Sequence, residues 1–91
     1  MVRSIVLHRV KDYGAWRQVY DSFADVQKQG GVRAEEVLQS VEDPNDVLVT
    51  HDFDDAATAH QFFSSSELRD AMMRAGVDGE PQLIWVGSIA D

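Results

Sequence analysis

Cysteine is absent from the 91-residue chain, and proline occurs only twice. The lack of cysteine excludes disulfide bonds and cysteine-based zinc sites, which stabilise many small domains. A chain of this length forms a single domain, and it buries only about 60–65% of the surface that it exposes when unfolded. We therefore expect one domain over residues 1–91 with a thin core, for which association with a second copy is the remaining source of stability.

Basic side chains are also scarce. The 8 Lys and Arg residues are outnumbered by 16 Asp and Glu residues, which gives a formal net charge of −8. This charge opposes binding to nucleic acid or to an anionic membrane. No run approaches the roughly 20 apolar residues of a membrane-spanning helix, and the N-terminus lacks the pattern of a signal peptide. We expect a cytoplasmic protein that binds neither nucleic acid nor membranes.

Alternating side chains predict four β-strands. These strands cover residues 4–10, 32–41, 47–53 and 82–89, with a loop at residues 77–81 before the last one. The segment EDPND is a turn between the second and third strands, because proline and asparagine favour the dihedral angles of a turn. Glu35 and Glu36 interrupt the second strand, which predicts either a bulge or an exposed sheet edge.

Apolar residues at helical spacing predict a first helix whose aromatic side chains form one stripe. This helix begins after Asp12, a favoured N-cap residue, and ends at Gly30-Gly31, where glycine accepts a left-handed conformation. A second helix is expected over residues 56–63. A third begins at the serine run 64–66, which together with Glu67 has the spacing of a capping box.

The order of these elements is β-α-β-β-α(α)-β. It predicts an α+β, ferredoxin-like fold, in which a four-stranded antiparallel sheet carries its helices on one face. The other face would expose Val, Ile, Leu and Trp side chains, and a second copy of the chain can cover them. We therefore expect a homodimer.

Three segments of the chain resemble a known family. They are HRVKDYGAWRQVYD at residues 8–21, EDPN followed by VLVTHDFDD, and SELRDAMMRAGVDGEP at residues 66–81. Over nearly its whole length the chain resembles small bacterial proteins of the dimeric α+β barrel superfamily, near the antibiotic biosynthesis monooxygenase-like group. The resemblance implies two sheets packed face to face, with a pocket in each subunit between its sheet and its helices. The superfamily includes cofactor-independent monooxygenases of aromatic polyketides, polyketide cyclases and haem-degrading enzymes.

Two histidines interrupt otherwise apolar strand faces. His8 and His51 share their faces with valines, and in the predicted order their strands are adjacent, central and antiparallel. Because histidine titrates near neutrality, such a pair could remove a proton from a phenol or an acidic C–H group. The alternative is that each ring is a core residue with satisfied hydrogen bonds, or packs at the dimer interface.

Five aromatic residues are candidates for the wall of a substrate pocket beside these histidines. They are Tyr13, Trp16, Tyr20, Phe53 and Trp85. Aromatic residues at helical spacing are also typical of an ordinary core, so packing alone is the alternative for this set. A third histidine, His60, lies on the helix predicted over residues 56–63. The three histidines lack HxH or HExxH spacing, so we predict no metal site.

These features lead to one leading hypothesis and two alternatives. The leading hypothesis is a homodimeric enzyme that needs no cofactor and acts on a hydrophobic or aromatic, polyketide-like metabolite by monooxygenation or cyclisation. In it, His51 and His8 supply acid–base chemistry. The alternatives are a non-catalytic module for ligand binding or dimerisation, with a filled core and hydrogen-bonded histidines, and a haem-degrading protein with a histidine at a pocket mouth.

Overall fold

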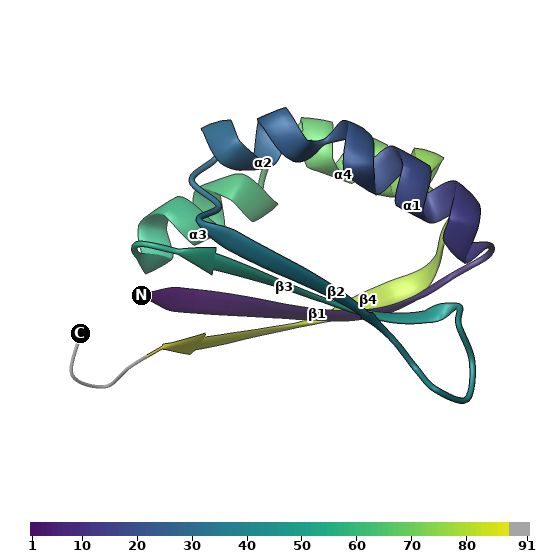
Figure 1. Ribbon diagram of the computed structural model, residues 1–91. Helices are drawn as coiled ribbons and strands as arrows, with labels where there is room; N and C mark the ends of the chain where they lie inside the picture. Colours follow the sequence, from purple (N-terminus) through teal and green to yellow (C-terminus); the bar gives the residue numbers. More distant parts are fainter. Residues whose placement is uncertain (88–91) are drawn as a thin grey trace.

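Residues 1–87 are described by the computed structural model, in which four strands and four helices make two layers. The elements are β1 (Val2–Val10), α1 (Tyr13–Ser22), α2 (Ala24–Gln29), β2 (Ala34–Gln39), β3 (Asp46–Phe53), α3 (Ala56–Phe63), α4 (Ser66–Arg74) and β4 (Val77–Gly87). The helices lie over one face of the sheet and leave the other face uncovered (Figure 1). Within this part of the chain, no helix has the length and apolar composition needed to cross a membrane.

The strands form one antiparallel sheet in the order β2-β3-β1-β4. The central pair is therefore β1 and β3, which confirms the predicted α+β, ferredoxin-like fold. On the covered face of this pair, Val10 and Val47 are only 1% and 0% exposed. Side chains on this face of β1 and β3 are thus held at the centre of the molecule.

The first helix differs from its prediction, because α1 and α2 replace one continuous helix. The chain bends at Phe23, which has φ −95° and ψ 8°, and its N–H donates to the carbonyl of Tyr20 at 3.0 Å instead of continuing the α-helical pattern. After the bend, the buried residue of α2 is Gln27, whereas Val26 is only partly buried. A polar amide therefore reaches the interior where the sequence predicted an apolar stripe.

Two strands also differ in length from their predictions. β2 ends before Val41, which is fully exposed in the hairpin loop. β4 begins at Val77, within the predicted loop, because Val77 pairs with Val10 on β1 after a register shift. Pro81 is tolerated there because β4 is an edge strand and proline lacks only a ladder donor. The predicted end of this strand, residues 88 and 89, lies outside the described residues.

Polar side chains cap α1, α3 and α4 at their N-termini, whereas α2 follows Phe23 without such a cap. Asp12 accepts a hydrogen bond from the Ala15 N–H at 2.9 Å, as its predicted N-cap role requires. In α4 the capping residue is Ser65, which accepts from the Leu68 N–H, so the capping spacing predicted from Ser64 is displaced by one residue.

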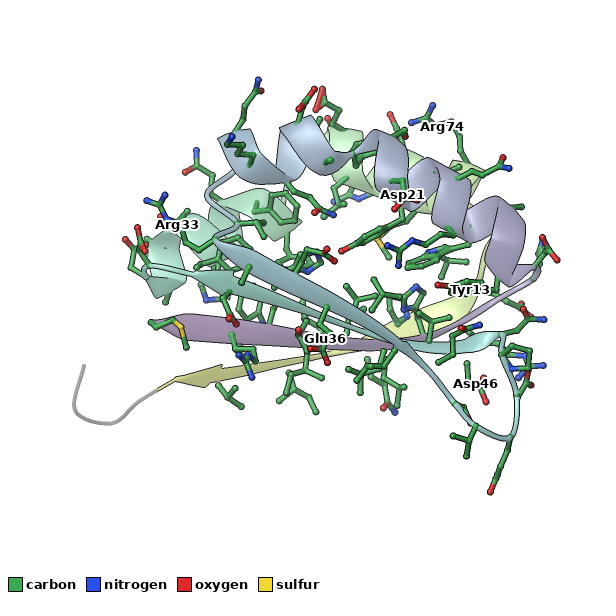
Figure 2. All side chains as sticks on the ribbon, in the orientation of Figure 1. Tyr13, Asp21, Arg33, Glu36, Asp46 and Arg74 are labelled. Atoms are coloured by element: carbon green, nitrogen blue, oxygen red, sulfur yellow. The ribbon has the colours of Figure 1, made fainter. Side chains whose placement is uncertain are left out.

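The core lies entirely on the covered face and has two parts. One part is centred on Val10, Trp16 and Val47, and the other on Phe53 and Phe62 next to α3. Phe63 packs against both. Figure 2 shows side chains filling much of the space between the sheet and the helices, while another set projects from the uncovered face.

Candidate functional site

The two histidines of the central strands lie on the covered face of the sheet. His51 is opposite Ser4 in the ladder, and His8 is opposite Val47. The rung between them, Val6 opposite Val49, belongs to the same face. A separation of four residues along a strand corresponds to about 13 Å, so the two rings face the same layer without touching each other.

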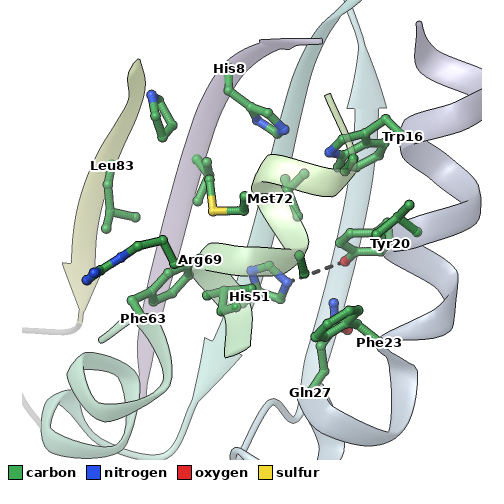
Figure 3. Close-up of a pocket in the computed structure, with 17 residues that line it drawn as sticks. His8, Trp16, Tyr20, Phe23, Gln27, His51, Phe63, Arg69, Met72 and Leu83 are labelled. Atoms are coloured by element: carbon green, nitrogen blue, oxygen red, sulfur yellow. Dashed lines mark hydrogen bonds between the residues drawn. The ribbon is translucent and has the colours of Figure 1, made fainter. Parts of the chain in front are cut away.

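A cavity of about 240 Å³ occupies this layer, between the sheet and the helices (Figure 3). Its walls are largely apolar. The lining residues are Val6, His8, Trp16, Val19, Tyr20, Phe23, Gln27, Val49, His51, Phe63, Leu68, Arg69, Ala71, Met72, Ala75, Pro81 and Leu83. Three of them, Arg69, Pro81 and Leu83, are exposed residues of α4 and β4, and they mark the mouth of the cavity.

His51 is enclosed by aromatic rings at the inner part of this cavity. Only 5% of the residue is exposed, and its ring centroid lies 5.8 Å from that of Phe62 and 5.9 Å from that of Phe63. Burial lowers the pKa of His51 to about 4, although the carboxylates of Glu35 and Asp52 act in the opposite direction. The ring is therefore uncharged at neutral pH.

Tyr20 and Glu35 form a short hydrogen-bonded chain beside His51. The Tyr20 hydroxyl donates to Oε2 of Glu35 at 2.6 Å, and its oxygen lies 3.4 Å from Nε2 of His51 (Figure 3). Burial raises the pKa of Tyr20, and the hydrogen bond to Glu35 raises it further, so the phenol stays protonated. Because its single proton is engaged by the carboxylate, the Tyr20 oxygen can accept a hydrogen bond from His51 only when Nε2 of His51 carries a proton.

His8 lies under Trp16, with 5.4 Å between the ring centroids. Burial lowers the pKa of His8 also. In both histidines Nδ1 is enclosed and has no hydrogen-bond partner within residues 1–87, so Nε2 is the nitrogen left to meet a ligand. Across the same residues, no three His, Asp or Glu side chains gather closely enough to hold a metal ion.

Comparison with known proteins identifies the family of this chain. The family model for antibiotic biosynthesis monooxygenases matches residues 11–74, which is more than half of the chain. The chain belongs to the antibiotic biosynthesis monooxygenase family. The resemblance seen in the sequence, to this group of the dimeric α+β barrel superfamily, is thereby confirmed. No curated protein sequence matches the chain significantly.

Solved structures of the same fold cover almost the entire chain. A candidate antibiotic biosynthesis monooxygenase from Bordetella bronchiseptica has a TM-score of 0.83 at 12% identity, with 97% of this chain and 96% of that chain covered. SnoaB, a cofactor-independent oxygenase from Streptomyces nogalater, has a TM-score of 0.80 at 10% identity, with 96% and 91% covered. A second candidate monooxygenase, from Nitrosomonas europaea, has a TM-score of 0.79 at 15% identity, with 98% and 99% covered. At these identities the similarity establishes the fold of this family member.

Of the aromatic residues proposed from the sequence, Trp16 and Tyr20 line the cavity, and their rings stack 4.9 Å apart. Tyr13, Phe53 and Trp85 are not among its lining residues. Tyr13 packs behind Trp16 at 5.8 Å, Phe53 is 0% exposed in the second core cluster, and Trp85 stacks on His60 at 4.4 Å. The helical stripe and the strand alternation predict which face of its helix or strand each residue occupies, but not its distance from the cavity.

Several residues of the site were not predicted from the sequence. Gln27 is buried beside the cavity after the bend between α1 and α2, where the sequence predicted an apolar stripe. The sequence predicts either a bulge or an exposed edge at Glu35 and Glu36. β2 is an edge strand without a bulge, and its register places Glu35 opposite His51, where it contacts Tyr20. Arg69 gave no signal, because a single arginine on a polar helix face looks like a solvated charge.

Proposed function

We propose that this protein is a cofactor-independent oxygenase of a small aromatic phenol or enol, with His51 as the base. The observation that carries the proposal is an uncharged, nearly buried histidine in an apolar cavity, with its Nε2 directed toward a tyrosine–carboxylate pair. Family membership supports it, and so does the shared fold of SnoaB, which is a cofactor-independent oxygenase. The cavity is smaller than the roughly 300–1,000 Å³ of sites for drug-sized ligands, which favours a compact substrate of few rings.

The proposed reaction oxidises an activated CH₂ group to a carbonyl. Nε2 of His51 takes a proton from the substrate carbon, which requires the lone pair of the neutral ring at that nitrogen. The carbanion adds dioxygen, and the proton held by His51 returns to the resulting peroxide. Loss of water then leaves the carbonyl, so one oxygen atom stays in the product and the other departs in water.

Tyr20 and Glu35 stabilise His51 after it has accepted the proton. The Nε2–H of the imidazolium can donate to the Tyr20 oxygen, 3.4 Å away, while the Tyr20 hydroxyl remains bound to the Glu35 carboxylate. Catalytic hydrogen bonds are often long before substrate binds and tighten afterwards. His8 is the second acid–base group, and it faces the other part of the cavity below Trp16.

The alternatives fit these observations less well. A non-catalytic module for ligand binding or dimerisation is expected to have a filled core and hydrogen-bonded ring nitrogens, whereas the cavity is open and Nδ1 of each histidine lacks a partner within residues 1–87. A haem-degrading role calls for a histidine at the cavity mouth. His8 and His51 are 7% and 5% exposed in the interior, and the exposed His60 stacks on Trp85 away from the cavity.

We also propose that the protein is a homodimer through the uncovered face of the sheet. Leu7, Ile84 and Val86 project from that face and are 45%, 55% and 43% exposed. Ile5 and Leu48 belong to the same face by register. An apolar surface of this kind on adjacent strands favours burial against an identical surface.

Oxygen uptake tests the catalytic proposal. Enolisable aromatic ketones, with anthrone and 2-tetralone as probes, should consume one dioxygen for each carbonyl formed. His51→Gln should reduce kcat/KM about 100-fold or more, which is a typical contribution of a general base. Thr50→Ala, one residue earlier on β3 but on the uncovered face, should leave kcat/KM unchanged. Wild-type turnover by a folded His51→Gln variant would remove His51 from the mechanism.

A further inference from the structure

Among residues 1–87, Arg69 is the only formally charged residue that lines the cavity. The other arginines of β1, α1 and the loop before β2 are paired with carboxylates, namely Arg3 with Asp52, Arg9 with Asp43 and Asp46, Arg17 with Asp21, and Arg33 with Asp54. Arg74 lies over the ring of Phe23. Within residues 1–87 Arg69 forms no ion pair, although the chain carries twice as many acids as bases.

The side chain of Arg69 lies at the mouth of the cavity. It extends from α4 toward β4, near Phe63 and Leu83, while Tyr20 and its contact with His51 lie on the opposite side (Figure 3). The acids of the same helix, Glu67 and Asp70, are not among the lining residues. The cavity therefore has one cationic end and one end that contains Tyr20 bound to Glu35.

We propose that Arg69 binds an anionic group of the ligand, so that the cavity is built for a small aromatic acid rather than a neutral aromatic compound. A guanidinium presents a planar set of donors that matches a carboxylate in a bidentate arrangement. The negative charge of Glu35 repels a carboxylate from the other end. Arg69 and Glu35 together orient the ligand, with its carboxylate at the mouth and its phenol or enol toward His51. This inference rests on the proposed function only in taking the cavity as the ligand site.

Binding of a matched pair of probes tests the proposal without requiring turnover. The probes are 2-naphthoate and 2-naphthamide, which have nearly the same shape and differ in charge. Calorimetry at low ionic strength should give an affinity for the naphthoate about fivefold higher than for the amide, the size expected for a partly exposed ion pair. The preference should shrink when salt is added, because screening weakens such a pair.

Variants assign the preference to Arg69. In Arg69→Gln the two probes should bind equally, and Arg69→Lys should restore part of the difference. Arg33→Gln removes the same charge from an exposed site outside the cavity, so it should keep the wild-type preference. Because Arg69 is exposed, its substitution leaves the core intact.

The outcomes separate this inference from the proposed function. Equal binding of both probes to the wild-type protein, tighter binding of the amide, or a naphthoate preference that persists in Arg69→Gln would overturn the role of Arg69 while the cavity remained a ligand site. Failure of both probes to bind at millimolar concentration would overturn the ligand site itself, and with it both proposals. A naphthoate preference without any oxygen uptake would support Arg69 and count against the oxygenase.

Discussion

His51 and Asp52 are neighbours on β3 and point to opposite faces of the sheet, with 5% and 9% of each residue exposed. Asp52 is held by Arg3, whose Nε and Nη2 donate to its two oxygens at 2.7 and 3.0 Å, and this guanidinium lowers the pKa of the carboxyl group. His51 has no such partner, so burial dominates and its ring is neutral. Similar exposed fractions thus accompany a charged group on one face and an uncharged one on the other. Asp52 has an opposite charge in contact and lies on the open face of the sheet, whereas His51 is enclosed between the sheet and the helices.

The largest expected difference between the two faces concerns packing. Phe53→Ala removes a fully buried ring from the covered face and should lower the free energy of unfolding by about 3–5 kcal/mol. Ile84→Ala on the uncovered face, where the side chain is 55% exposed, should cost less than about 1 kcal/mol in the monomer. Urea unfolding at low protein concentration measures both. A similar loss in the two variants would mean that the uncovered face is as tightly packed as the core.

A charge on the uncovered face tests whether a second copy covers it. Ile84→Glu would place an unpaired carboxylate in the proposed dimer interface, which should weaken association at least about 100-fold. Sedimentation velocity at micromolar concentration should then show a dimer for the wild-type protein and a monomer for the variant. Arg33→Gln, an exposed change near the helices, serves as the dimeric control. A monomeric wild-type protein would contradict the proposed homodimer.

The neutral state of His51 should appear in the dependence of stability on pH. At pH values well above 6.5 the histidine is neutral in both the folded and the unfolded chain. As the pH falls below 6.5, the unfolded chain takes up a proton while folded His51 stays neutral until about pH 4, so the folded state loses stability. Between pH 7 and pH 5 this should remove about 2 kcal/mol from the free energy of unfolding.

His51→Gln isolates that contribution, because glutamine does not titrate. Its loss of stability between pH 7 and pH 5 should be smaller than that of the wild-type protein, with the remainder due largely to His8, whose pKa is lowered in the same direction. The carboxylates with lowered pKa, such as Asp52, contribute at more acidic pH and do not interfere in this window. An identical loss in both proteins would show that folded His51 takes up a proton like an exposed histidine.

The smallest expected effect comes from the charge beside Tyr20. The Glu35 carboxylate raises the pKa of His51 against the effect of burial, so Glu35→Gln should lower that pKa further. Glu36→Gln, the next residue of β2 but on the other face, should not change it. Titration of the His51 ring signals by NMR measures both shifts. A rise of the His51 pKa in Glu35→Gln would show that the Glu35 carboxylate does not stabilise the protonated His51 ring.

Local patterns were sufficient for most of the fold. Alternation placed His8 and His51 on valine-rich faces, and Asp12 marked the start of α1, because both signals depend on neighbouring residues alone. The limits of β2 and β4 were less accurate. Val77 pairs with Val10 of β1, a strand distant in the sequence, whereas Val41 lies in the hairpin loop beyond the last pair of β2 with β3. The bend at Phe23 has no signal in the local sequence, because the apolar stripe of this segment is also compatible with an unbroken helix.

The composition and the order of elements determined a small acidic domain with a helix-covered sheet, because periodicity and capping are properties of the chain itself. Only the tertiary structure decided that Tyr20, Glu35 and His51 form a contact, since they come from three separate elements. It also decided that His51 and His8 line one cavity and that Arg69 lies at its mouth. The charge state of His51 and the ligand preference of the cavity depend on burial and on residues from other elements of the fold, and a local sequence pattern does not predict these contacts.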